Sequence, residues 1–518
     1  MSRPTTPQRS GSRTPVADPV QGMEMGHART ASTQTNASSK KLPPSSGRLF
    51  YAVNTQRWRV FWDRLRGKNR PSISVLKSIE GIIISSWLNI FFLCVPFAWV
   101  SHFHAVWGHS VTFALCFLSI IPLENMFDWG GEQMTFYLGP ELGDLLTITL
   151  NNAVEATLAI ILLIHCELRL LQSTIVGVII LHLLLIPGTA FMAGGVQIWQ
   201  QDLLEHTTQL NHSLLMLGVM AILLPTALFA ALDRGAQTTT QLLPDGFSSS
   251  LINDSVRDKI LRMSRGLSVL LLIVYVCSRV FVHSGPEAGQ SGDVNNEKAG
   301  AQDNALDRTE SHLGVDERHS EEEQPVVGPG ACLILLIITV GIMAATAEWL
   351  VESIEFVREE GNIEVEWFGL ILLPIVSFAA DGTVAIVDFT LSIFKHLTGI
   401  EVKEPEPLAR ARAIDLSIQF ALFWMPLLVL LGWWIGKPMH LMFDYFELAL
   451  LLGACFLVNY VTADAKTNWV EGLILIMFYL MIAICAWFYV GQPELTIMLT
   501  CPGSVAEALA SGVTENSG

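Results

Sequence analysis

Long apolar segments recur along the chain and are separated by short polar connections. A helix needs about 20 mostly apolar residues to cross a bilayer, and runs of that length repeat here. The pattern predicts an all-α polytopic membrane protein with about eleven transmembrane helices. They are expected near residues 82–103, 105–126, 143–166, 170–195, 212–233, 263–283, 330–355, 366–394, 413–435, 446–463 and 469–490.

Composition supports this class and excludes others. The chain has 518 residues, of which 51% are hydrophobic and only 15% charged, so a soluble multidomain enzyme is excluded. The eight cysteines are scattered singly without metal-binding spacing, and we interpret them as small core residues. No nucleotide-binding loop, nucleophile elbow or nucleic-acid module is found. The chain is therefore not expected to be an enzyme, to hold a cofactor or to bind nucleic acid, and its predicted surroundings are the lipid bilayer.

Charge is distributed unevenly and sets the predicted topology. Residues 1–78 hold 14 of the 31 Lys and Arg but only three acids, which places a disordered tail in the cytosol. Residues 285–325 carry eleven acids and by parity form a cytosolic linker. We expect a tail (1–78), a first helix (79–104), a first repeat (105–284), an acidic linker (285–329), a second repeat (330–490) and a C-terminal tail (491–518).

One decapeptide occurs twice, once in each predicted repeat. Residues 151–160 read NNAVEATLAI and residues 377–386 read SFAADGTVAI, with four identities and one carboxylate in each copy, Glu155 and Asp381. The copies are five spans apart, so their helices cross the membrane in opposite senses. Inverted repeats of this kind meet around a substrate site near the membrane midplane.

An acid inside a membrane span is by default a functional site, because hydrocarbon makes its charge costly. Burial favours the protonated carboxyl, whereas a bound cation favours the ionised one, so protons and cations compete for Glu155 and Asp381. With amide oxygens from Asn151 and Asn152, the two acids suit a hard cation such as Ca²⁺ or Na⁺.

Other polar residues inside the spans are candidates for the transport pathway. Glu348 and Glu352 share one face of the seventh span, whereas Glu124 and Asp144 are expected where spans meet water. Gln172 and Ser173 in the fourth span correspond to Ser417 and Gln419 in the ninth. Whether these line the pathway or join helices stays open. His182 either carries protons or packs as a hydrogen-bonded residue.

The chain resembles the cation/proton exchangers of the Ca²⁺/cation antiporter superfamily over residues 82–490. The similarity lies in LNNAVE (150–155), GLILLPIV (369–376), SIQFAL (417–422), PLLVLLG (426–432), LVNYVTAD (457–464) and NWVEG (468–472). The resemblance implies two inverted five-helix repeats behind an extra first helix, with Glu155 and Asp381 in the positions of the paired cation-binding glutamates. The second copy departs from the usual GNAAEH, since Phe378 replaces an Asn and Gly382 a His.

The missing oxygen donors make the chain similar to the fungal vacuolar branch that includes low-affinity monovalent cation/proton antiporters. We expect proton-coupled transport of Ca²⁺, Na⁺ or K⁺ from the cytosol into an acidic organelle, with the vacuolar membrane expected first and the ER or Golgi as alternatives. The competing hypothesis is a transport-inactive relative that acts as a scaffold or sensor. An intramembrane aspartyl protease built on Asp144 and Asp381 is rejected, because Glu141 stands where its motif needs Gly. The oligomeric state stays open.

Overall fold

The computed structural model describes most of the membrane part of the chain. It covers residues 75–104, 107–195, 201–203, 205–240, 253–284, 325–398 and 407–501, together with Trp62, Ile73, Gly503, Val505 and Glu507. Contacts divide the chain into residues 1–57 and 58–518, and the first unit lies wholly outside the described residues. The basic tail up to residue 61, residues 285–324 of the acidic linker and residues 508–518 are likewise not described.

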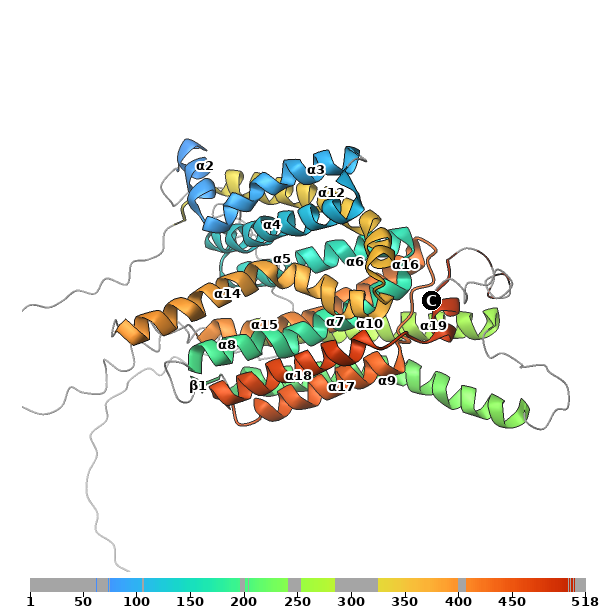
Figure 1. Ribbon diagram of the computed structural model, residues 1–518. Coiled ribbons are helices and arrows are strands. Elements are labelled where there is room, and N and C mark those ends of the chain that lie inside the picture. The colour runs from blue at the N-terminus through green and yellow to red at the C-terminus, as the bar shows by residue number, and fades with distance from the viewer. Residues whose placement is uncertain are drawn as a thin grey trace, which may run out of the picture. The chain divides into compact units, whose positions relative to one another are not determined.

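The first half of the described chain is a series of long helices (Figure 1). In chain order they are α2 (Val75–Ile84), the 3₁₀ segment η2 (Trp87–Leu93), α3 (Cys94–Phe103), α4 (His109–Leu138), α5 (Pro140–Asn151), α6 (Ala153–His165), α7 (Leu168–Ile180), the π-helical η4 (Leu181–Leu185), α8 (Ile186–Gly195), α9 (Glu205–Thr240) and α10 (Asp254–Ser284).

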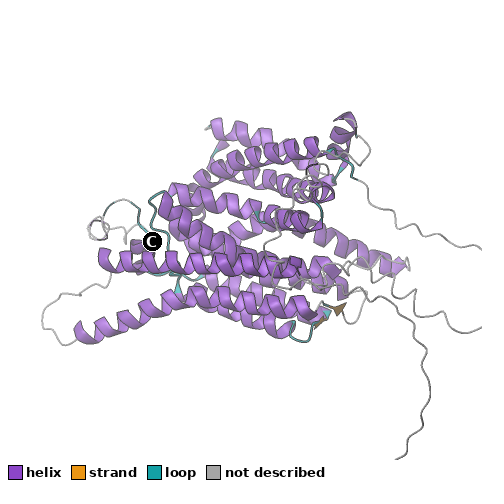
Figure 2. Cartoon of the chain, turned by 180° about the vertical axis from the view of Figure 1, so that it is seen from behind, coloured by secondary structure: helices purple, strands orange, loops and turns teal. Residues whose placement is uncertain are grey.

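The second half begins after the acidic linker and is also mostly helical. It comprises α12 (Pro329–Gly361), α13 (Val365–Trp367), the π-helical η6 (Phe368–Leu372), α14 (Leu373–Thr398), α15 (Pro407–Gln419), the π-helical η7 (Phe420–Trp424), α16 (Met425–Trp434), α17 (Tyr445–Val461), α18 (Trp469–Trp487) and α19 (Pro493–Met498). One short antiparallel pair, β1 (Gln201–Asp202) with β2 (Lys466–Thr467), joins the halves. Nearly everything else that is described is helix, as Figure 2 shows.

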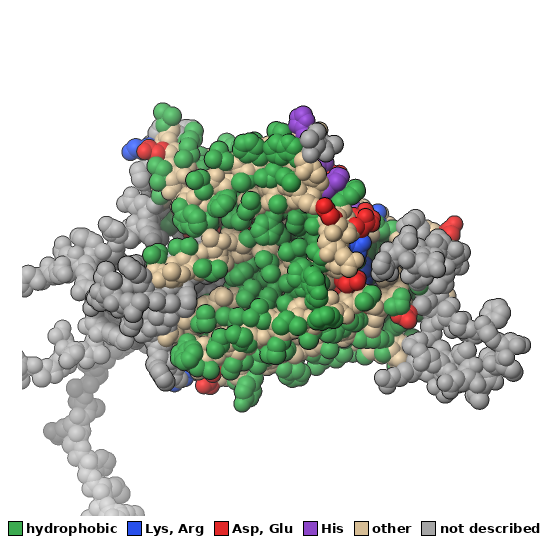
Figure 3. Space-filling model, in the orientation of Figure 1, with side chains coloured by type: hydrophobic (Ala, Val, Ile, Leu, Met, Phe, Trp, Pro, Cys, Tyr) green, Lys and Arg blue, Asp and Glu red, His purple; other side chains and the backbone are tan. Residues whose placement is uncertain are grey.

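The predicted class is confirmed, and each predicted span falls on a helix. Among the described residues, seven helices are long and apolar enough to cross a membrane, and two bent helix pairs raise that number to nine. Two shorter apolar helices, Val365–Ala380 and Tyr445–Val461, cover the remaining predicted segments. Apolar side chains dominate the outer face in Figure 3, as expected for helices that face lipid. The total of eleven crossings stays a prediction.

The fourth and ninth predicted spans have the same internal plan. Each has an α-helix of 13 residues, a π-helical segment of five and an α-helix of ten: α7, η4 and α8 in the first half, α15, η7 and α16 in the second. Two segments of one plan at corresponding places are what an internal repeat produces. Their opposite orientation in the membrane stays a prediction.

Glycines let helices of the two halves approach closely. A Cβ added at Gly177 of α7 would lie 2.7 Å from Cγ of Pro374, and one added at Gly369 of η6 would lie 2.7 Å from Cβ of Ser173. The crossing of α8 and α18 is equally tight, since a Cβ at Gly472 would lie 2.6 Å from the Gly188 carbonyl oxygen. Small residues at such crossings bring backbones into van der Waals contact, which drives helix association in lipid.

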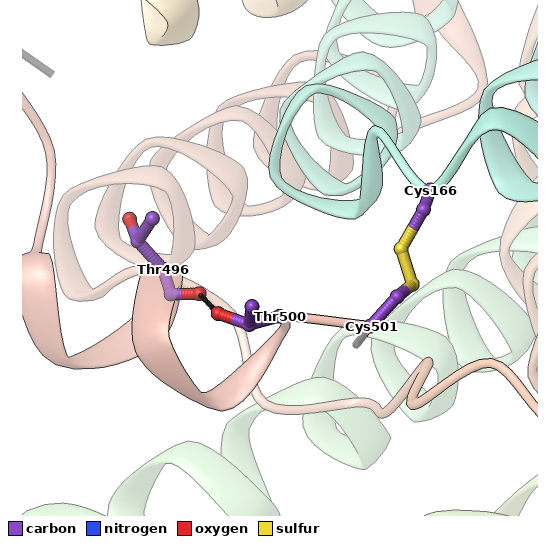
Figure 4. The surroundings of a disulfide bond; sticks show 4 residues. All are labelled: Cys166, Thr496, Thr500 and Cys501. Atoms are coloured by element: carbon purple, nitrogen blue, oxygen red, sulfur yellow. Dashed lines mark hydrogen bonds between the residues drawn. A yellow bond between two sulfur atoms is a disulfide. The ribbon is translucent and has the colours of Figure 1, made fainter. Parts of the chain in front are cut away.

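A disulfide joins Cys166, which follows α6, to Cys501, which follows α19 (Figure 4). Their Cα atoms are 6.3 Å apart, although 335 residues separate them in sequence. Our interpretation of all cysteines as core residues is therefore wrong for this pair and for Cys277 and Cys485, which are exposed, whereas Cys116, Cys332 and Cys455 are buried and free. Single cysteines carry no local pairing signal. By the predicted topology both partners lie on the lumenal side, and disulfides persist in oxidising compartments.

Because of this disulfide, the two halves of the chain should stay covalently linked after the acidic linker is cleaved. With a specific protease site inserted between residues 285 and 324, the cut protein should migrate as one species without reductant and as two with it. Reduction should lower the free energy of unfolding by about 2–4 kcal/mol. The cleaved Cys501→Ser variant should migrate as two species even without reductant. The matched control, Cys485→Ser, should behave like the wild-type protein. If the cleaved protein that keeps both cysteines migrates as two species without reductant, the bond is excluded.

Candidate functional site

A break between two helices positions Glu155. Helix α5 ends at Asn151 and α6 begins at Ala153, and the two axes are bent by 55°. Asn152, with φ −99° and ψ 11°, is the N-cap of α6, so Glu155 is its third residue. The first turn of a helix leaves backbone N–H groups without intrahelical partners and carries a partial positive charge. The break therefore places an acid where its ionised form is stabilised.

Glu155 is buried and faces a small cavity. Glu155 is 4% exposed. The cavity leaves about 10 Å³ for the centre of a water molecule, which is room for about one molecule. The cavity is lined from both halves of the chain by Glu124, Asp128, Asn151, Glu155, Leu181, His182, Ile186, Ser377, Phe378 and Leu416. An ion that enters it must shed nearly all of its hydration shell.

His182 lies in the π-helical segment η4 and faces Glu155. Its Nε2 atom is 3.9 Å from Oε1 of Glu155, and both side chains are 4% exposed. The Nδ1 atom donates to the Val178 carbonyl oxygen at 2.8 Å, so Nε2 is the atom left to face the acid. If either the Glu155 carboxyl or Nε2 of His182 carries a proton, the two groups can form a hydrogen bond once Oε1 and Nε2 move closer together. A π-bulge widens a helix locally and often marks a functional site.

The position of Glu124 differs from the prediction, which placed this residue where a span meets water. Helix α4 continues to Leu138, well past the predicted end at residue 126, so Glu124 lies near its middle and is 7% exposed. Its Oε2 accepts a hydrogen bond from the Ala380 N–H at 3.4 Å. Asp128, one turn further on, lines the same cavity. Asp144 is exposed, as expected.

The second copy of the decapeptide approaches the cavity from α14. Ser377 and Phe378 line it, whereas the side chain of Asp381, one turn after Ser377, lies outside the described residues. The pairing of Asp381 with Glu155 therefore stays a prediction. Unlike the first copy, the second lies in a helix that continues unbroken from Leu373 to Thr398. Among the described side chains, no three His, Cys, Asp or Glu converge closely enough to hold a metal ion.

The two asparagines of the first copy take different places. Asn151 lines the cavity, whereas Asn152 is fully buried and its Nδ2 donates to Oε1 of Gln419 at 2.6 Å. Gln419 in turn donates to Thr149 Oγ1 at 3.2 Å. These amides join α15 to the broken helix and hold the break in place.

The other predicted pathway residues do not line this cavity. Ser417 donates to the Ile414 carbonyl oxygen, and Ser173 donates to Glu447. Gln172 donates to the carbonyl oxygens of His440 and Met442, at 2.9 and 3.0 Å. Burial lowers the pKa of His440, which lies between α16 and α17, to about 4, so its ring is neutral above that pH. Glu348 and Glu352 lie near the far end of α12, beside His165 and His102.

Comparison with known proteins identifies the family. The sodium/calcium exchanger protein family matches residues 108–283 and 331–488, which together are more than half of the chain. The chain belongs to this family. This exchanger is 31% identical to a vacuolar calcium ion transporter of Cryptococcus neoformans over 81% of the chain and 77% of that protein. It is 30% identical to a vacuolar calcium ion transporter of Schizosaccharomyces pombe, over 83% of the chain and 92% of that protein.

A bacterial relative and a solved structure extend the comparison. A Ca²⁺/H⁺ antiporter of Synechocystis is 31% identical over 76% of the chain and 95% of that protein. The solved structure of native YfkE has a TM-score of 0.54 with 22% identity, and covers 77% of the exchanger and 100% of that chain. At that identity the structure supports the fold alone.

Sequence reasoning missed a buried ion-pair network in the exchanger. Arg169 of α7 donates through Nη2 to Glu366 Oε1 at 2.7 Å and to Asp444 Oδ2 at 2.9 Å. Tyr489 and the backbone N–H of Gln492 also donate to Asp444, at 2.7 and 3.1 Å. An arginine within an apolar run signals a buried charge, but its partners lie about 200 residues away or more. The network ties α7 to α13, α17 and the C-terminal segment.

The position of Glu124 predicts a role in cation binding. Glu124→Gln keeps the shape and the contact with the Ala380 N–H but removes a charge from the cavity. We expect about a tenfold higher half-saturating cation concentration, because a charged partner contributes on the order of 1.5–3 kcal/mol. Cation-dependent proton flux in reconstituted vesicles is the measurement. Glu132→Gln, an exposed acid on the same helix, should have no effect, and unchanged affinity in Glu124→Gln would remove Glu124 from the site.

Proposed function

We propose that this exchanger carries Ca²⁺, with Na⁺ or K⁺ as alternative cargo, from the cytosol into the vacuole or another acidic organelle in exchange for protons. The observation that carries the proposal is the buried carboxylate of Glu155 at a helix break, beside an imidazole and a second buried acid. Such an acid binds either a proton or a cation, and exclusive occupancy is what couples their movements.

The names of the relatives support the organelle and the cargo. Two fungal relatives are named vacuolar calcium ion transporters, and the cyanobacterial one a Ca²⁺/H⁺ antiporter. The proposal concerns a transporter and not an enzyme, in keeping with its family. The proton gradient of the organelle supplies the driving force.

The cavity provides more acids than the decapeptides alone predict. Ca²⁺ takes six to eight oxygen ligands in proteins, and Phe378 contributes none. Glu124 and Asp128 provide carboxylates that were not counted from the sequence, and for this reason we place Ca²⁺ before the monovalent cations. In the described conformation these acids do not converge on one point. Cation binding therefore requires the helices to close around the ion or Asp381 to supply further ligands.

Glu155 is predicted to be essential for exchange. Glu155→Gln retains the size and hydrogen bonding of the side chain but neither titrates nor attracts a cation. Cation-driven proton efflux from acid-loaded vesicles should fall by about a hundredfold or more, because binding of both substrates is lost. Expression and thermal unfolding should be unchanged, and Glu359→Gln is an exposed control. Exchange at the wild-type rate would disprove this site. Absence of exchange in the wild-type protein itself would favour the scaffold or sensor hypothesis.

Phe378 is predicted to limit the preference for Ca²⁺. Phe378→Asn places an amide oxygen in the cavity and should lower the half-saturating Ca²⁺ concentration relative to K⁺ by about tenfold, the equivalent of about 1.4 kcal/mol. Proton efflux is measured while Ca²⁺, Na⁺ and K⁺ are added separately. Phe378→Leu, which adds room but no oxygen, is the control. An equal change in both variants would assign the effect to volume and not to ligation.

A further inference from the structure

A row of acidic and aromatic residues on α12 faces histidines from the first half of the chain. Glu348, Glu352, Phe356 and Glu360 recur every four residues and so share one helix face. Across from them lie His102 at the end of α3, His109 at the start of α4 and His165 at the end of α6. None of these histidines takes part in the site around Glu155.

Each histidine contacts a different turn of α12. His165 Nε2 lies 2.6 Å from Glu348 Oε1, and His102 Nδ1 lies 3.7 Å from Glu352 Oε2. The His102 ring stacks on Trp349 with centroids 4.9 Å apart. The His109 ring stacks on Phe356 at 3.8 Å, and next to it Ser110 donates to Glu360. The row therefore joins α12 to three helices at once.

This row is more exposed than the cavity at Glu155. The side chains of His165 and Glu348 are 35% and 38% exposed. A cavity of about 390 Å³ opens between α3, α4 and α12, and its lining includes His102, His104, His109, Trp349, Glu352 and Phe356. Figure 3 shows histidines gathered with acidic side chains at this end of the apolar surface. The neighbouring disulfide at Cys166 and the predicted topology place this end in the lumen.

We propose that these histidine–glutamate pairs form a lumenal proton-binding site, separate from Glu155, that latches α12 to α6 and α3 when the lumen is acidic. The direction of the proton gradient is taken from the proposed function. Histidine is the side chain whose charge ordinarily changes between pH 5 and 8. Protonation converts each neutral contact into an ion pair across the two halves.

The charged groups around His165 are mostly acidic. Besides Glu348, the groups that face this region are Glu355 and Arg358 of α12 and Glu167 of the α6–α7 connection. Burial and the nearby Glu355 raise the pKa of Glu167. On the His102 side, the cavity is lined by Glu352 with His104 and His109. The acids thus outnumber the fixed cation near His165, whereas near His102 two further histidines line the cavity with one carboxylate.

The latch connects lumenal protons to the helix that carries Glu155. Helix α6 begins with the turn that holds Glu155 and ends with His165, so it is one rigid segment of 13 residues. Its other end begins at the break, where Asn152 is bridged to Gln419. With that end held by the amide bridge, holding His165 against α12 fixes the tilt of the segment and the position of Glu155 relative to the cavity.

The first experiment is independent of transport. A double-mutant cycle of His165→Gln and Glu348→Gln is measured on the full chain by thermal unfolding at pH 5.5 and 7.5. At pH 5.5 each single variant should unfold about one to three degrees lower, and the double variant should unfold no lower than either one. At pH 7.5 the coupling should largely vanish. His212→Gln of α9 with Glu359→Gln, which both lie outside the row, is the control pair. Equal coupling at both pH values would overturn the proposal.

The second experiment measures exchange against lumenal pH. His165→Gln and Glu348→Gln should change the rate at pH 5.5 by about two- to fivefold and leave it unchanged at pH 7.5. His165→Lys keeps a permanent cation opposite Glu348. Its rate at both pH values should therefore equal the wild-type rate at pH 5.5. Wild-type profiles in all three variants would refute the latch. Glu155→Gln should abolish exchange but keep the unfolding cycle intact, so a failure of the proposed function is distinguished from a failure of the latch.

Discussion

The cost of placing a carboxylate inside a membrane governs the architecture of this protein. An ionised acid at the centre of a spanning helix costs about 2.5–3.5 kcal/mol on insertion scales and more if it is isolated. At Glu155 this cost is reduced by two local features: the helix break that gives it an N-terminal turn, and a cavity that admits about one water molecule. Each of these also makes the acid sensitive to whichever cation or proton is present.

The buried polar contacts around the site mostly join one half of the chain to the other. They include Asn152 with Gln419, Arg169 with Glu366 and Asp444, Ser173 with Glu447, and Arg279 with Asp415. In lipid, apolar contact alone does not specify which helices pair, because the solvent is equally apolar. Hydrogen-bonded pairs and the glycine crossings at Gly177 and Gly369 supply that specificity.

The sequence predicts what depends on local pattern and misses what depends on contact between distant residues. Spans follow from hydropathy because the bilayer imposes one length, and Glu155 follows from a charge inside a span. The end of α4 was predicted too early, because Asn125, Asp128 and Glu132 interrupt the apolar run although the helix continues through them. Glu124 was consequently assigned to an interface. The partners of Arg169 and Cys166 lie far along the chain and have no local signature. The pairing of Glu155 with Asp381 stays a prediction from the repeated decapeptide.

Exchange requires that the site open to each side in turn, and the packing indicates which parts can move. The ion-pair network restrains α7, and the amide bridge joins α15 to the break at the start of α6. The far end of α6 leads into the disulfide-bonded connection at Cys166. Helix α14, which brings Ser377 and Phe378 to the cavity, is continuous, and the π-helical η6 directly precedes it. A tilt of α6 against a fixed frame changes the distance from Glu155 to Glu124 and His182 without breaking a buried ion pair. Such a tilt would therefore shift the competition between proton and cation at Glu155.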